Sequence, residues 1–583
     1  MEVDAPSFPH HLLALLIHIS EADFVSFDLE LSGIPSHLPS KKPRAGRLTL
    51  EDRYAETKEG ADRYQILQVG LTCAKFDYVA NQYVLRPFNI NLSPLLDERL
   101  DFEREISFQS GACTFLLGCG FDLGAPFAKG VQYLSREEAV RAKRLAYDRI
   151  DKKNPISDLQ LKDTDTESLD FVRRCRDAIT AWQKTTSSSL EITSSTGSPI
   201  AASTFTISRF EKRLVHQLVR AEFPNAVAIG RNDCIRILPF DAEREADNTR
   251  RIKSRVKEQI ARQTGFRWIF EALVGGEVNP DLLYITRGSA GVDGRDRFDR
   301  ALARLKTKQP VLVGHNMFTD VVYLYRTFVG PLPDTLAGFN DALHELFPKI
   351  IDTKYLATHA EGDLNASPTL EEIAKGLQDQ PLPSIVTHEE HGKYNDMEAF
   401  HEAGYDSLLT ATIMLRLAAK LGSERKTDEP RPPLQREASE GGIRLPTPAD
   451  DFIIDGREKI QHPVRVPPTS ATNGKKKRSK SKKAAATTKF ETKNLFDNLK
   501  ALSMDDQTSS SDEEAEPTAN GHWADEVFVQ DKTGWVPVKK MTRQKLELIP
   551  PFDDAFWATF GNKLRVFGTE EREMRIAGWP KRV

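Results

Sequence analysis

Two carboxylates stand two positions apart in the apolar run FVSFDLEL, residues 24–31. Side chains alternate between the two faces of a strand, so Asp28 and Glu30 share one face, and Phe27, Leu29 and Leu31 share the other. The two acids are then about 6–7 Å apart, and they repel each other by about 2–3 kcal/mol at an effective dielectric of about 20. A strand that keeps like charges this close usually does so for a cation. The pair therefore predicts a metal-dependent enzyme.

Three other segments carry residue types that could join this chemistry. VGHNMFTD holds His315 and Asp320, HEAGYD holds His401 and Asp406, and FPKIIDTK ends on Lys354. Each has an ordinary explanation when taken alone. The two aspartates could be helix N-terminal carboxylates favoured by the macrodipole. The histidines could be core or capping residues, and the lysine a solvated strand end.

Composition limits the class of protein. A length of 583 residues predicts three or four domains at about 150 residues each. The five cysteines form no Cys-x-x-Cys pair, so neither a zinc site nor a disulfide framework is indicated. The apolar run 12–17 is too short to span a bilayer and lacks a basic leader. We therefore expect an intracellular protein without a membrane anchor.

Regular elements must bring these residues together. The pattern predicts a meander of strands followed by helices and a buried strand before Asp320. Ser208 and Glu211 form a predicted capping box at the start of an insert helix. The strands are expected at 24–31, 63–76, 83–92, 234–238, 311–314 and 347–354. The helices are expected at 10–20, 102–150, 208–223, 243–263, 266–273, from 320, and at 399–421. Residues 185–204, rich in Ser and Thr, are expected to form a flexible loop.

Six segments, in order along residues 10–420, resemble the His-containing subtype of the DEDD exonuclease superfamily, and within it the poly(A)-specific ribonucleases. They are FDLELSGI, RYQILQVGL, GFDLGAPFAKGVQYLSREE, VGHNMFTDVVYLYRTFVGPLP, FPKIIDTKYLA and HEAGYDSLLTATIMLRLA. One such segment alone would be weak, and their joint presence in order is strong.

The resemblance implies a role for each candidate residue. The four acids would hold two Mg²⁺ ions, a hard cation that prefers carboxylate oxygens: Asp28, Glu30, Asp320 and Asp406. His401 would be the general base, since imidazole can accept a proton near neutral pH. His315 and Lys354 match positions near the scissile phosphate or the 3′ nucleotide, and would bind substrate.

The expected fold is α/β. It is an RNase H-like nuclease core with a mixed sheet flanked by helices, a small α/β insert, and a disordered C-terminal region with basic and acidic runs. The expected segments are the first part of the core at 1–164, the insert with its Ser/Thr-rich loop at 165–260, the second part of the core at 261–422, a linker at 423–522, and a last segment at 523–583. That last segment could dock on the core or form a separate unit.

The predicted function is Mg²⁺-dependent 3′→5′ hydrolysis of single-stranded RNA 3′ ends, and of poly(A) in particular. Two alternatives stay open: 3′ trimming of small non-coding RNAs, and an RNA-binding scaffold without turnover. The insert carries Lys212-x-x-x-His216 where family members carry Arg-x-x-x-His. A nucleic-acid-binding helix and a structural amphipathic helix both fit that departure.

The resemblance further implies a homodimer. Seven of the nine residues 475–483 are basic, which fits a nuclear localisation signal or a phosphate-binding tail, so we expect the protein in nucleus and cytoplasm. No signature of an RNA-recognition domain follows Gly422, so activity stimulated by a 5′ cap is not predicted.

Overall fold

The structure, a computed structural model, describes residues 1–34, 46–96, 100–151, 158–198, 206–285, 293–360, 368–428, 528–531, 534–537 and 549–580. The basic run 475–483, the acidic run 512–516 and nearly all of the predicted linker lie outside the described residues.

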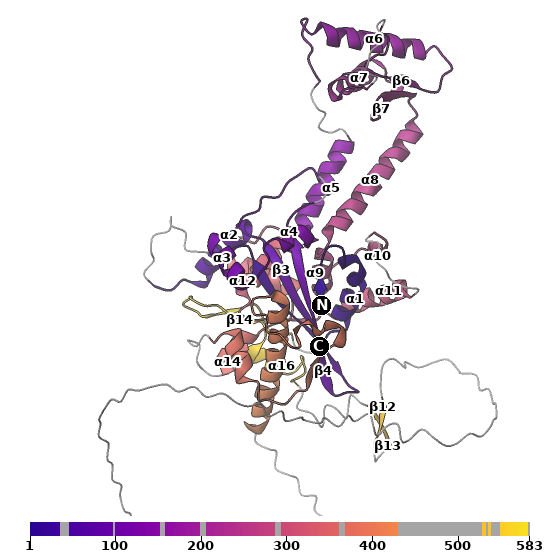
Figure 1. Cartoon of the computed structure of the whole chain (residues 1–583). Coiled ribbons are helices and arrows are strands. Elements are labelled where there is room, and N and C mark those ends of the chain that lie inside the picture. Colours follow the sequence, from indigo (N-terminus) through magenta and orange to yellow (C-terminus); the bar gives the residue numbers. More distant parts are fainter. Residues whose placement is uncertain are drawn as a thin grey trace, which may run out of the picture. The chain divides into compact units, whose positions relative to one another are not determined.

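A mixed sheet organises the core of the chain (Figure 1). Its strands are β1 (Glu2–Val3), β2 (Phe24–Leu31), β3 (Ile66–Asp77), β4 (Gln82–Ser93), β5 (Val131–Gln132), β9 (Val311–Gly314), β10 (Ile350–Asp352) and β11 (Ile385–Thr387). The main path runs β1-β4-β3-β2-β9-β10. Strands β2, β3 and β4 pair in antiparallel fashion, whereas β9 and β10 continue from β2 in parallel. This is the mixed sheet of the expected RNase H-like core, so the predicted fold class is confirmed.

Helices connect and follow these strands along the chain. They are α1 (Phe8–Glu21), α2 (Leu50–Arg63), α3 (Ser110–Gly118), α4 (Ala125–Lys129), α5 (Arg136–Ile150), α8 (Ala242–Thr264), α9 (Arg267–Leu273), α10 (Leu282–Ile285), α11 (Gly294–Thr307), α12 (Phe318–Phe328), α13 (Leu336–Leu346), α14 (Thr353–Ala360), α15 (Leu370–Gly376), the 3₁₀ helix η1 (Glu389–Tyr394) and α16 (Ala403–Asp428). Among the described residues, no helix is long and apolar enough to cross a membrane.

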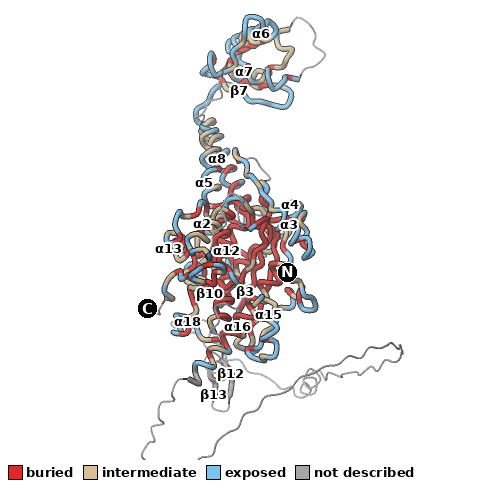
Figure 2. The backbone as a smooth tube through the Cα atoms, turned by 90° about the vertical axis from the view of Figure 1, so that its left-hand side faces the viewer, coloured by how far each residue is buried: buried red, intermediate tan, exposed pale blue. Residues whose placement is uncertain are grey.

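Alternation along β2 assigns its side chains to two cores. Val25, Phe27 and Leu29 join a cluster with residues of α1, α9 and α12. Phe24 joins a second cluster, which contains Leu415 and other residues of α16. Figure 2 shows the buried residues gathered along these strands and the helices that accompany them. By the same alternation, Asp28 and Glu30 point to the side of the sheet that α16 covers.

The insert has its own small core. It comprises α6 (Thr166–Trp182), β6 (Leu190–Ile192), α7 (Arg209–Glu222), β7 (Ala226–Gly230) and β8 (Ile235–Pro239), with the strands in the order β6-β8-β7. The capping box at the start of α7 forms as predicted: Ser208 accepts from the Glu211 N–H, and the Glu211 carboxylate accepts from the Ser208 N–H. Strand β6 lies inside the stretch predicted to be a flexible loop.

The last described segment, 549–580, packs on the core that the mixed sheet organises. It contains α18 (Phe556–Phe560), β14 (Lys563–Arg565) and β15 (Glu573–Arg575). Trp557 is fully buried in the α16 cluster, and Leu564 is fully buried in the other. Strands β12 (Phe528–Asp531) and β13 (Gly534–Pro537) form a separate hairpin. The sequence left docking open, and this part of the segment docks.

Several predicted bounds are wrong. Residues 102–150 are not one helical region, because β5 pairs with β4 and separates α4 from α5. Strand β10 is three residues long, so Lys354 lies in the first turn of α14 rather than at a strand end. Helix α16 begins at Ala403 and extends to Asp428, beyond the predicted start of the linker.

Candidate active site

Three elements bring the four acids together. Asp28 and Glu30 lie on β2, beyond the last residue that pairs with β9. That last pair is Ser26 with Val313. Asp320 lies in the first turn of α12, which follows β9, and Asp406 in the first turn of α16. Since β2 and β9 are parallel neighbours, the residues that follow them meet at one edge of the sheet.

The start of α16 is fixed on the sheet by hydrogen bonds to side chains of β3 and β4. The Ala403 N–H donates to Gln68 Oε1, and the Gly404 N–H donates to Asn89 Oδ1, each at 3.0 Å. These bonds satisfy two of the N–H groups that every helix start leaves without an intrahelical partner. Gly70, which is opposite Asp28 in the β2–β3 register, makes the close approach possible. A Cβ there would lie 1.8 Å from Ala403 O.

A buried polar contact sets the position of α16 relative to β2. Ser26 Oγ donates to the Ser407 carbonyl at 2.8 Å, and the Ser407 hydroxyl lies 2.9 Å from that of Thr72. Ser407 follows Asp406 directly. The sheet therefore positions Asp406 through Ser407, the residue next to it.

Electrostatics show that the carboxylates face one another. Burial raises the pKa of Asp28 well above its ordinary value, and repulsion by Asp406, Glu30 and Asp320 adds to it. Burial also raises the pKa of Glu30, with further repulsion from Asp406 and Asp320. Burial is the main reason that the pKa values of Asp320 and Asp406 rise to about 7. Such a group of carboxylates is costly unless a cation neutralises it.

The donor set fits a divalent metal. One ligand atom each from Glu30, His401 and Asp406 lies within 4.8 Å of the others. Asp406 is 7% exposed, and its Oδ2 accepts from the His401 N–H at 3.0 Å. Its Oδ1 is buried and has no partner among the described residues. An oxygen-rich site with an orphaned carboxylate oxygen suits a hard cation.

His401 differs from the acids in being exposed. Its backbone has a φ of 66°, an uncommon conformation for a residue with a Cβ, and functional sites often hold such residues. Its ring meets the Phe115 ring edge-on, at 4.8 Å between centroids. Phe115, on α3, is exposed, and the sequence analysis missed it because it lies in no acidic motif.

His315 and Lys354 lie at the same edge, after β9 and β10, but outside the acid group. His315 Nδ1 lies 2.9 Å from the Thr353 hydroxyl. Burial lowers the His315 pKa to about 3, with Lys354 as the second cause, so the ring is neutral. Lys354 Nζ donates to the Pro368 carbonyl. Among the described residues, neither side chain is hydrogen-bonded to any of the four acids.

Asp352 is a second residue that the sequence analysis missed, although it stands in the quoted segment FPKIIDTK. It is fully buried. Its Oδ1 accepts from the N–H groups of Asn316 and Lys354, and its Oδ2 from that of Arg565, at 2.9–3.0 Å. It thereby joins the turn before α12 to the C-terminal segment, and its charge also raises the pKa of Asp320.

In the insert, Lys212 is occupied by structural contacts. Its Nζ donates to the carbonyls of Arg231 and Asn232 at 2.7 and 2.8 Å. These bonds favour the structural interpretation of the Lys212-x-x-x-His216 pattern.

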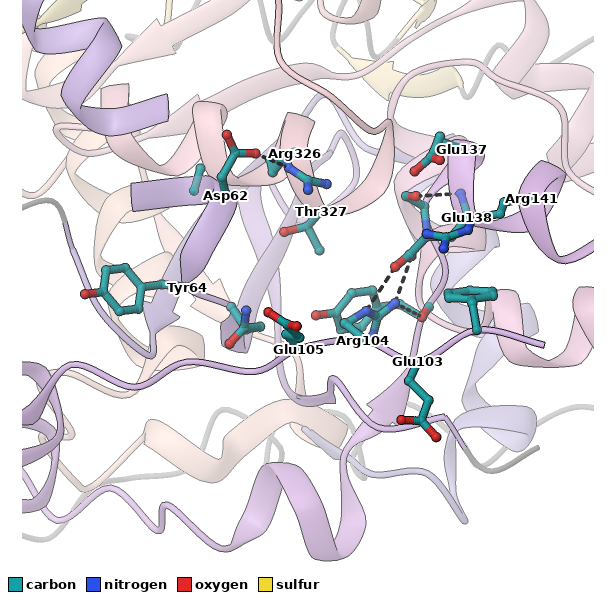
Figure 3. Close-up of a pocket in the computed structure, with 15 residues that line it drawn as sticks. Asp62, Tyr64, Glu103, Arg104, Glu105, Glu137, Glu138, Arg141, Arg326 and Thr327 are labelled. Carbon is teal, nitrogen blue, oxygen red and sulfur yellow. Dashed lines mark hydrogen bonds and ion pairs between the residues drawn. The ribbon is translucent and has the colours of Figure 1, made fainter. Parts of the chain in front are cut away.

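A separate polar pocket of about 260 Å³ lies between α2, α5 and α12 (Figure 3). Arg104 forms a two-pronged ion pair with Glu138, and Arg326 pairs with Asp62. None of the seven candidate residues lines this pocket.

The sequence pattern described as "CAF1 family ribonuclease" matches residues 3–414, more than half of the chain. The chain belongs to the CAF1 ribonuclease family. The resemblance drawn from the sequence is thereby confirmed at the level of the family.

Relatives of this CAF1 family chain carry more specific names. It is 24% identical over 435 residues to the poly(A)-specific ribonuclease PARN of Danio rerio, covering 73% of this chain and 60% of that protein. It is 25% identical over 438 residues to the pre-piRNA 3′-exonuclease trimmer of Bombyx mori, covering 72% and 71%. The chain thus spans about 60% of the length of the first relative. The structure of S. pombe Pop2p in its Mg²⁺ and Mn²⁺ bound form covers 71% of this chain and 89% of that one at 13% identity, and its TM-score of 0.32 is too low to carry an argument.

Proposed function

We propose that this CAF1 family chain is a Mg²⁺-dependent 3′→5′ exoribonuclease that shortens single-stranded RNA 3′ ends, poly(A) tails in particular. The observation that carries the proposal is the group of four carboxylates at one edge of the sheet, with Asp406 Oδ1 buried and lacking a partner among the described residues. Family membership and the name of the Danio rerio relative support the reaction and the substrate.

The acids would hold two Mg²⁺ ions: Asp28, Glu30, Asp320 and Asp406. Bound by these residues, a pair of divalent ions would supply an activated water and would stabilise charge on the leaving 3′ oxygen. His401 accepts the proton of the attacking water, because its ring lies at the exposed side of the carboxylates. Phe115 limits the orientations of that ring. His315, neutral through burial, and Lys354 border the site and contact the RNA.

The test is cleavage of a 5′-labelled oligo(A) by the full chain, with Mg²⁺ and with EDTA. We expect stepwise shortening only with Mg²⁺, and its loss by at least about 10³-fold in Asp28→Asn. Asp341→Asn, at an exposed acid of α13, is the matched control and should keep wild-type rates. Undiminished cleavage by Asp28→Asn, with its metal dependence intact, would refute the assignment.

Trimming of small non-coding RNA is the second candidate, and the name of the Bombyx mori relative favours it. Initial rates on oligo(A), oligo(U) and oligo(C) of equal length separate the two. A poly(A) nuclease should act on oligo(A) at least about ten-fold faster than on the others, whereas equal rates would support trimming.

A homodimer and a distribution over nucleus and cytoplasm are also proposed. The homodimer rests on the resemblance to the poly(A)-specific ribonucleases, and Leu117 of α3, 58% exposed, is the position at which it is tested. Light scattering should give twice the chain mass of 65.6 kDa, and Leu117→Asp should reduce it. Loss of nuclear signal on neutralising residues 475–483 would support the localisation, and an unchanged distribution would contradict it.

A further inference from the structure

The C-terminal segment 549–580 completes the edge of the nuclease sheet. Asn562 is fully buried, and its side chain accepts from the Ile350 N–H and donates to the Pro348 carbonyl, at 2.8 and 2.9 Å. Next to it, the Arg565 N–H donates to Asp352. The segment therefore covers β10 in the way a further strand would, and places its β14–β15 hairpin beside the residue that follows that strand.

This hairpin gathers positive charge at Lys354. Two cations lie near the Phe567 ring, with Lys354 Nζ 4.9 Å and Arg565 Cζ 4.6 Å from its centroid. Arg565 donates to the Arg572 carbonyl, and Leu48, the neighbour of Arg47, exchanges backbone hydrogen bonds with Gly568 and Glu570. We call these four residues the basic cluster: Arg47, Lys354, Arg565 and Arg572.

The acids around the basic cluster already have partners. Asp352 accepts three backbone N–H groups. Glu573 is hydrogen-bonded to Tyr355, Glu571 accepts from the Leu50 N–H, and Glu372 caps α15. Lys354 and Arg565 are only 5% and 3% exposed, whereas Arg47 is exposed and Arg572 half-buried, so Arg47 and Arg572 are the members that a ligand can reach.

Strand register places the basic cluster relative to the carboxylates. Asp352 pairs with Gly314, and Val313 pairs with Ser26, so the residues after β10 leave the sheet at the same edge as Asp28. Two interstrand spacings separate β10 from β2, which is about 10 Å. The basic cluster therefore lies beside the carboxylates, on the side where β9 and β10 end.

We propose that the basic cluster is the site that holds RNA backbone phosphates beside the scissile bond. The inference rests on the proposed function and deepens it. Two Mg²⁺ ions would only neutralise the four carboxylates, so a net attraction for the RNA backbone comes from further cations beside them. Phe567 attracts both Lys354 and Arg565 through its ring face, and Arg47 and Arg572 extend the positive surface outwards. The CAF1 match ends at residue 414, so a segment outside the matched region supplies half of the cluster.

The experiment compares wild type, Arg47→Gln/Arg572→Gln, and a control with the same change in charge, Arg297→Gln/Arg300→Gln, at exposed residues of α11. We expect the cluster variant to raise the KM for oligo(A) about ten-fold and to leave kcat within about two-fold. The slope of log binding constant against log salt concentration should become shallower by about 1.4 for the two lost contacts, since each phosphate contact of a single strand contributes about 0.7 to that slope. Thermal melts should coincide for all three proteins, because the changed side chains are not in the core.

Two outcomes overturn the inference: a KM and salt dependence equal to those of the control, or a loss confined to kcat. Binding of labelled oligo(A) to Asp28→Asn, with and without the cluster substitutions, keeps the test independent of turnover. If wild type does not cleave RNA, the proposed function fails. The inference then stands only if the cluster substitutions still weaken binding about ten-fold.

Discussion

At the level of residues, the site is a set of groups that destabilise one another without a cation. Each of the four carboxylates is buried enough for its pKa to rise, and for Asp28 and Glu30 repulsion by the other acids contributes directly. The free energy of folding therefore depends on what neutralises them, which is either protons or metal.

Asp406→Asn should stabilise the metal-free protein, and more strongly at high pH. The pKa of Asp406 rises to about 7 in the fold, above the value near 3.9 of an unfolded chain. Its contribution to stability is therefore present in full below about pH 4 and is lost as the pH rises through 7. In EDTA, the variant should melt a few degrees above wild type at pH 8, with a smaller gap at pH 5. A gap that shrinks as pH rises would contradict the assigned cause.

His401→Gln should test the proposed role of this residue as the general base. Loss of a general base typically costs about 10²–10⁴-fold in rate. Because His401 is exposed, the melting temperature should not change. Single-turnover cleavage of oligo(A) measures the step directly. A rate within three-fold of wild type would remove the residue from the mechanism.

At the level of elements, the approach of α16 to the sheet decides where Asp406 lies. The first turn of the helix is bonded to Gln68 and Asn89, and its backbone passes over Gly70, where no side chain fits. Two glycines serve this contact, since a Cβ at Gly404 would also meet Asn89 at 2.7 Å.

Gly70→Ala should therefore impair both stability and activity. The added methyl would meet a backbone oxygen that cannot move alone, and overpacking of this kind costs about 1–3 kcal/mol or more. We expect cleavage to fall at least about ten-fold, because α16 must shift with Asp406 on it. Gly376→Ala is the control, since a Cβ there meets nothing within 4 Å. Urea unfolding and initial rates measure the two effects, and wild-type values for both would refute the packing argument.

At the level of the whole molecule, the chain closes its nuclease core with residues distant in sequence. The Asn562 side chain accepts from the Ile350 N–H across 212 residues of chain. The Leu48 N–H donates to the Gly568 carbonyl, and the Leu48 carbonyl accepts from the Glu570 N–H. The segment thus touches both the end of β10 and the chain that follows β2. It is part of the core rather than an appended tail.

Asn562→Gly should weaken the docking of segment 549–580 on the core. Glycine tolerates the φ of 55° at this position, so the substitution removes the side-chain bonds without adding backbone strain. The buried Ile350 N–H then loses its partner, which costs about 1–3 kcal/mol. We expect a lower urea midpoint and faster proteolysis within 549–580. Proteolysis at the wild-type rate would mean that apolar packing alone holds the segment.

The sequence alone predicted the candidate residues of the site and determined the type of most elements. Alternation along β2 assigned Asp28 and Glu30 to one face and Phe27, Leu29 and Leu31 to the apolar one, and the ordered motifs named the family. Local physics was sufficient there, because strand periodicity and the Ser208–Glu211 capping box depend on neighbouring residues only.

Only the tertiary structure decided how the site is held and what surrounds it. The contact of Gly70 with Ala403, the bonds of Asp352 and the docking of Phe567 against Lys354 each join residues far apart in the chain. No local pattern encodes such contacts, because they depend on how sheet edges and helix ends meet in space. The sequence therefore supplied the chemical groups, and long-range packing set their geometry.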